Sequence, residues 1–207
     1  MTAMEELAGR WRGLMGRLGE PLPAAAWVEL ARRYGEGHRG YHDARHIAEC
    51  LALLAASDEP VADPTALELA IWYHDVIYDP RATDNEEQSA ALATTALAPL
   101  GAATVERVAA LIRCTADHEP GDLPDAPLLM DIDLAILGAE PTRFAEFEAG
   151  IRHEYAWVPI DRYQAARADV LASFLARPRL YHTVALYRER EAAARRNLTA
   201  TIAVLRK

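Results

Sequence analysis

Residues 64–79 have the sequence PTALELAIWYHDVIYD, a largely apolar segment that ends in adjacent His74 and Asp75. Asp63 before the segment is a typical N-cap residue, and proline is favoured at the first position of a helix. The segment therefore predicts a helix that begins near Pro64. A histidine and a carboxylate at the apolar end of such a helix need a partner, because burying an unpaired polar group is costly.

The same helical character extends outward over the rest of the chain. Alanine, leucine, glutamate and arginine dominate the 207 residues, and segments of alternating β-branched residues are absent. Breakers divide the sequence into about ten segments of helical length, and Pro141 restarts one of them. We expect an all-α fold of about ten helices, forming a single domain over residues 1–207. Its motif core would cover about 39–138, with C-terminal helices at 142–205 packed on that core.

Charge and composition exclude several classes of partner. The formal net charge is −9, from 22 basic and 31 acidic side chains, which disfavours nucleic acid polymers. A small anion remains compatible with this charge, because a bound cation reverses the local potential. Cys50 and Cys114, the two cysteines, fit reduced buried thiols. We find neither a secretory signal nor a membrane span, and expect a cytoplasmic protein.

Two further segments place ionisable residues among apolar ones. Residues 39–47 read RGYHDARHI and open a helix, on which His42 and His46 share one face because they are four positions apart. Residues 128–138 read LLMDIDLAILG, where Asp131 and Asp133 interrupt an apolar run. A buried carboxylate there must be paired or bound to a metal. Two imidazoles and two carboxylates suit one divalent ion of Mn, Fe, Mg, Co or Zn.

A lone histidine, an adjacent His-Asp pair and a distant aspartate in a helical chain resemble the HD superfamily of metal-dependent phosphohydrolases. His46, His74, Asp75 and Asp133 fill that pattern, with offsets of 28 residues (46 to 74) and 58 residues (75 to 133). The amino-acid sequence around these residues, over about residues 39–197, also resembles a bacterial family of predicted HD phosphohydrolases without assigned substrate.

The resemblance implies that His46, His74, Asp75 and Asp133 are the metal ligands. It places the fourth ligand at Asp133, with Asp131 as the reserve. Helical geometry does not decide between these two, since residues two apart point about 200° apart. We expect Asp131 to cap a helix or to lie on the surface. One ion is expected, because related enzymes with two ions use more histidines at the site, whereas His118 is the one additional histidine available there.

Five other residues are candidates for catalysis or substrate binding. His42 would transfer a proton or grip a phosphate oxygen, or else make a supporting hydrogen bond. Arg39 and Tyr41 would bind substrate phosphate, or else belong to a solvated loop. By resemblance, His118 would face the substrate, with a helix-terminal role as the alternative. Asp79, which matches half of an acidic pair in related hydrolases, is a general-base candidate or a turn residue.

These residues predict a metal-dependent phosphohydrolase of a small phosphate ester, either a nucleotide monophosphate or a guanosine polyphosphate alarmone. A non-catalytic protein that binds metal or senses nucleotides is the alternative, and a structural helical protein is a third. The expected partners are the phosphorylated substrate and, through amphipathic helices, a second copy in a homodimer. We expect neither a nucleic acid polymer nor a membrane as a partner.

Overall fold

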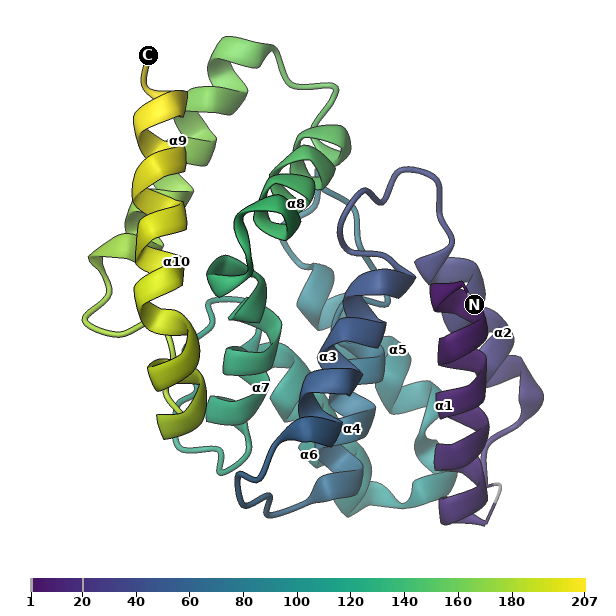
Figure 1. Cartoon of the computed structure of the whole chain (residues 1–207). Coiled ribbons are helices and arrows are strands. Elements are labelled where there is room, and N and C mark those ends of the chain that lie inside the picture. Colours follow the sequence, from purple (N-terminus) through teal and green to yellow (C-terminus); the bar gives the residue numbers. More distant parts are fainter. Residues whose placement is uncertain (1, 20) are drawn as a thin grey trace.

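The structure is a computed structural model and describes residues 2–19 and 21–207. In these residues every regular element is helical and no strand occurs, which confirms the predicted all-α fold of about ten helices (Figure 1). The elements are α1 (Ala3–Leu18), α2 (Ala24–Tyr34), α3 (Ala44–Ala56), α4 (Pro64–Tyr73), α5 (Asn85–Ala96), η1 (Ala98–Leu100), α6 (Ala102–Cys114), α7 (Ala126–Asp133), η2 (Leu134–Gly138), α8 (Pro141–Glu154), α9 (Ile160–Ala176) and α10 (Val184–Leu205).

Helix α4 lies at the centre of the core, in contact with α3, α5 and α6. It begins where the sequence predicts, with Pro64 in the first turn and the Asp63 carboxylate accepting a hydrogen bond from the Ala66 N–H. Apolar residues from Leu67 to Trp72 on this helix are fully buried, so almost its whole circumference faces other helices. Burial on all sides fixes the direction in which the end of α4 presents His74 and Asp75.

Helices α3 and α7 bring the other two sequence motifs to the same place. Asp43 caps α3 by accepting hydrogen bonds from the N–H groups of Arg45 and His46. Helix α7 packs against α3 and ends at Asp133, after which the chain continues as η2. The last residue of α7 therefore lies beside the first turn of α3.

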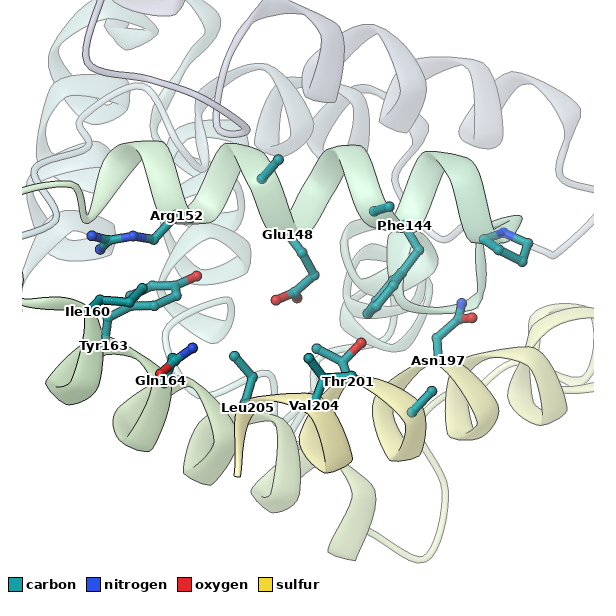
Figure 2. Close-up of a pocket in the computed structure, with 14 residues that line it drawn as sticks. Phe144, Glu148, Arg152, Ile160, Tyr163, Gln164, Asn197, Thr201, Val204 and Leu205 are labelled. Carbon is teal, nitrogen blue, oxygen red and sulfur yellow. The ribbon is translucent and has the colours of Figure 1, made fainter. Parts of the chain in front are cut away.

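The C-terminal third forms a separate layer (Figure 1). Helix α10 packs along α9 and η2, while α8 crosses between them and the N-terminal helices. A cavity of about 530 Å³ lies between α8 and the α9–α10 pair, and Glu148 points into it (Figure 2). In the described part of the chain, no helix combines the length and the hydropathy needed to cross a membrane.

Candidate metal centre

Four side chains from three segments converge at one point. The Nε2 atoms of His46 and His74 lie 3.2 Å apart. Asp75 Oδ2 lies 3.4 Å from the first and 3.1 Å from the second of these nitrogens. Asp133 Oδ1 lies 3.2 Å and 3.6 Å from the same two atoms. We call His46, His74, Asp75 and Asp133 the donor cluster; the two histidines are buried and the two aspartates nearly so.

The spacing of these atoms fits a metal ion. Ligand atoms about 2.1 Å from one ion lie roughly 3.0–3.4 Å apart in octahedral or tetrahedral coordination. The five separations given above for the donor cluster, between 3.1 and 3.6 Å, fall in or just above that range. Among the described residues, potential ligands form two overlapping groups that share His46. One contains His74 and Asp75, and the other contains Asp133 and Cys50.

The backbone fixes the orientation of His74. Its Nδ1 lies 3.0 Å from the Ile71 carbonyl oxygen, one turn earlier in the chain. A carbonyl only accepts hydrogen bonds, so Nδ1 carries a proton. Nε2 faces the cluster and presents its lone pair there when the ring is neutral. This is the tautomer that a metal-binding histidine needs.

Opposite charges balance one another within the cluster. Burial by itself lowers the pKa of His74, but Asp75 and Asp133 raise it well above the ordinary value. Burial by itself raises the pKa of Asp75, but His74 and His42 lower it well below the ordinary value. Burial likewise raises the pKa of Asp133, but His118 and the cluster histidines outweigh burial and hold this pKa well below the ordinary value. The site therefore favours ionised carboxylates, and a divalent ion would displace protons from the imidazoles.

The structure separates Asp131 from Asp133. Asp131 is fully buried and points away from the donor cluster, toward the start of α10. Its carboxylate accepts hydrogen bonds of 2.7 Å from the N–H groups of both His182 and Thr183, and one of 2.6 Å from the Thr183 hydroxyl. Asp131 thus acts as a buried cap, and Asp133 is the acid that meets the two imidazoles.

A cavity of about 540 Å³ opens onto the cluster, and Asp75 and Asp133 are part of its lining. We call it the cluster cavity. His42 also lines it, with its ring stacked on Tyr78 at 4.1 Å between centroids. The Nδ1 atom of His42 lies 2.8 Å from Glu154 Oε2, so this carboxylate holds the ring and leaves Nε2 for a ligand.

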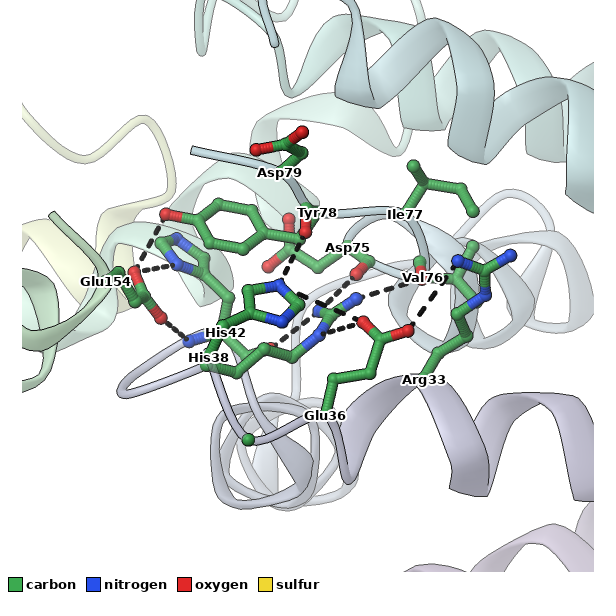
Figure 3. A network of polar contacts seen from close by, with 12 residues as sticks. Arg33, Glu36, His38, His42, Asp75, Val76, Ile77, Tyr78, Asp79 and Glu154 are labelled. Atoms are coloured by element: carbon green, nitrogen blue, oxygen red, sulfur yellow. Dashed lines mark hydrogen bonds and ion pairs between the residues drawn. The ribbon is translucent and has the colours of Figure 1, made fainter. Parts of the chain in front are cut away.

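Glu154 organises the loop before α3. Its buried carboxylate accepts hydrogen bonds from the N–H groups of Gly40, Tyr41 and His42. It also accepts one from the Tyr78 hydroxyl, and Figure 3 shows Glu154 beside Tyr78 and His42. Sequence reasoning did not single out Glu154 and missed this role. The signal was there, because Glu154 continues the apolar stripe of Phe147 and Ile151 at spacings of four and three residues.

Arg39 and Asp79 are not part of the cavity lining. The buried Arg39 guanidinium donates to the carbonyl oxygens of His42, Asp75 and Val76, at 2.7, 2.7 and 3.0 Å. Asp79 is exposed, and its carboxylate accepts from the Arg81 N–H in a turn. Arg39 therefore ties the loop before α3 to the His-Asp segment. The placement favours neither the predicted phosphate contact of Arg39 nor the predicted proton transfer by Asp79.

Tyr41 and His118 both border the cluster cavity, as their predicted roles require. The Tyr41 ring packs against His46 with 4.7 Å between centroids. His118 Nε2 lies 3.0 Å from Asp133 Oδ2, the oxygen that faces away from the two imidazoles. His118 has a φ of +53°, a left-handed conformation that is uncommon outside glycine and concentrates at functional sites. His118 thus makes a hydrogen bond to Asp133 that the sequence analysis did not predict, and its contact with substrate stays a prediction.

No protein-family model, curated protein or solved structure matches the chain significantly.

Proposed function

We propose that this protein is a metal-dependent phosphohydrolase of the HD type that acts on a small phosphate ester. The convergence of the donor cluster at the edge of a ligand-sized cavity is the observation that carries the proposal. Pockets that bind small molecules commonly have volumes of about 300–1,000 Å³. A closed structural metal site would need no such opening beside its ligands.

A divalent ion in the cluster would polarise a phosphate oxygen and lower the pKa of a nearby water. His46, His74, Asp75 and Asp133 would hold it. His118 would keep Asp133 in its orientation through the second carboxylate oxygen. Such supporting contacts fix ligand geometry and are important for metal affinity.

His42 is our candidate for moving a proton. Glu154 would accept a hydrogen bond from Nδ1–H, which leaves Nε2 as the atom that would pass a proton to the oxygen of the departing alcohol. The pair has the geometry of a histidine oriented by a buried carboxylate. Glu154 is a positioning residue, because its carboxylate contacts His42 and Tyr78 rather than the donor cluster.

Phosphate release tests the proposal. The purified chain, supplied in turn with Mn, Mg, Co and Zn, is assayed on a panel of phosphate esters. Asp75→Ala should abolish both bound metal and turnover, whereas Asp79→Ala, four residues later and outside the cavity, should retain both. Turnover that survives in Asp75→Ala would contradict the proposal. Bound metal without any turnover would favour the alternative, a metal-binding or sensing protein.

A further inference from the structure

The charged groups of the cluster cavity limit how much negative charge a ligand can bring. Four acids line the cavity, Asp75, Glu86, Asp117 and Asp133, against the guanidinium groups of Arg167 and Arg177. One divalent ion would offset the excess of two acids. The other polar ring groups that line the cavity are His42, whose Nδ1 contacts Glu154, and His118, whose Nε2 contacts Asp133, so few groups are left to bind more than one phosphate.

Both guanidinium groups are already engaged. Arg167 makes hydrogen bonds of 2.6 and 3.3 Å to Glu148, which projects from α8 toward the other cavity (Figure 2). Arg177 donates to the carbonyl oxygens of Asp117 and His118 at 2.8 and 3.1 Å. Recognition of a second phosphate by the planar fork of arginine would require breaking these contacts.

One wall of the cavity is apolar. Val170, Leu171 and Phe174 line it from one face of α9, because Phe174 follows Val170 by four residues and Leu171 by three. Phe147 and Ile151 line the cavity from α8. Val170 is 45% exposed, although it is a large apolar side chain.

This apolar wall begins at the donor cluster. The Phe174 ring meets His118 edge to face, with 5.8 Å between centroids, and His118 contacts Asp133. A ligand with its phosphate at the cluster would therefore extend its other end between α8 and α9.

We infer that the substrate is an ester with a single phosphate group on an apolar or aromatic body, which lies against α9. The inference rests on the proposed function and narrows it, because it selects a monophosphate over a guanosine polyphosphate.

Two matched pairs of compounds test the inference with the metal-loaded protein. Guanosine monophosphate and guanosine tetraphosphate share a body and differ in charge. Hexyl and ethyl phosphate release alcohols of similar basicity and differ in apolar length. We expect kcat/KM to favour the monophosphate by at least about tenfold, because each added phosphate is repelled by the cavity acids. Hexyl phosphate should exceed ethyl phosphate by at least about tenfold, because added methylene groups are buried.

A matched pair of variants locates the apolar contact. Val170→Ser should reduce the hexyl to ethyl ratio of kcat/KM, whereas Val28→Ser, on α2 and 63% exposed, should leave it unchanged. Equal or better use of the tetraphosphate, or no preference for the hexyl ester, would overturn the inference and leave the phosphohydrolase standing. No release from any ester, with metal bound, would overturn both.

Discussion

At the scale of single residues, the carboxylate of Glu154 makes the stability of the fold depend on pH. Burial by itself raises the pKa of Glu154. The His42 ring and the N–H groups of Tyr41 and His42 outweigh this effect and lower the pKa to about 2. A carboxyl group whose pKa is lower in the folded than in the unfolded chain stabilises the fold above its unfolded pKa, about 4.3. That contribution is lost as the pH falls from there toward 2.

We predict that Glu154→Gln weakens the loss of stability in acid. The wild-type free energy of unfolding should fall more steeply than that of the variant between about pH 4.5 and pH 2, by up to about 1.4 kcal/mol per pH unit. Urea unfolding at a series of pH values measures both curves. Because the other acids are common to both proteins, the difference isolates Glu154, and parallel curves would contradict the assignment.

Asp131 and Asp133 give a contrast between stability and metal binding. Asp131→Asn keeps the shape of the side chain but replaces one acceptor oxygen with a donor facing the N–H groups of His182 and Thr183. An unsatisfied buried group costs about 1–3 kcal/mol, which corresponds to a melting temperature lower by roughly 2–12 °C. Calorimetry should show this decrease while the bound metal stays at the wild-type level. Loss of metal with unchanged stability would reverse the two roles.

Sequence patterns could place the candidate ligands but not their neighbours. His74, Asp75 and Asp133 were visible because a charged or polar group inside an apolar run needs a partner. Arg39 looked like a phosphate ligand because the sequence does not show that three carbonyl oxygens surround its guanidinium. Such contacts depend on where the loop before α3 and the end of α4 meet in space.

At the scale of elements, α8 and the loop before α3 touch through two glycines. A Cβ on Gly150 would lie 2.5 Å from the Gly40 carbonyl oxygen, and a Cβ on Gly40 would lie 2.4 Å from that of Gly150. Both values are too short for real contacts, so neither position has space for a side chain. This close approach lets Glu154, one turn further along α8, reach the N–H groups of the loop.

We predict that Gly150→Ala separates the two elements. Forcing a methyl group into a tight contact typically costs about 1–3 kcal/mol, although alanine favours a helix more than glycine does. Thermal unfolding should show a lower melting temperature, and turnover should fall because His42 moves. Gly9→Ala on α1, where a Cβ meets nothing within 4 Å, is the control and should be neutral or stabilising. Equal behaviour of the two variants would contradict the proposed contact.

Helix boundaries were predictable where the chemistry of a turn is local. Asp63-Pro64 and Pro141 each begin a helix as expected, because capping and the fixed φ of proline act within a few residues. The function of α8 was not predictable in this way. Its periodicity aligns Glu154 with the apolar stripe, but only its packing shows that the carboxylate meets the loop before α3.

At the scale of the whole molecule, the site depends on contacts between distant parts of the sequence. His42 and Glu154 are 112 residues apart, and His46 and His74 are 28 apart. Periodicity within one helix carries no information about which helices become neighbours. The all-α fold and its approximate number of helices therefore followed from the sequence, whereas the cavity and its apolar wall required the tertiary structure.

Metal content of the purified protein tests the central claim most directly. The protein is purified without added metal or chelator, and bound metals are measured alongside Asp133→Asn and Asp79→Asn. We expect about one ion per chain in the wild type and in Asp79→Asn, and almost none in Asp133→Asn, because a missing ligand weakens the site. Absence of bound metal from the wild type, even after incubation with Mn, Fe, Mg, Co or Zn, would contradict the assignment of the donor cluster as a metal centre.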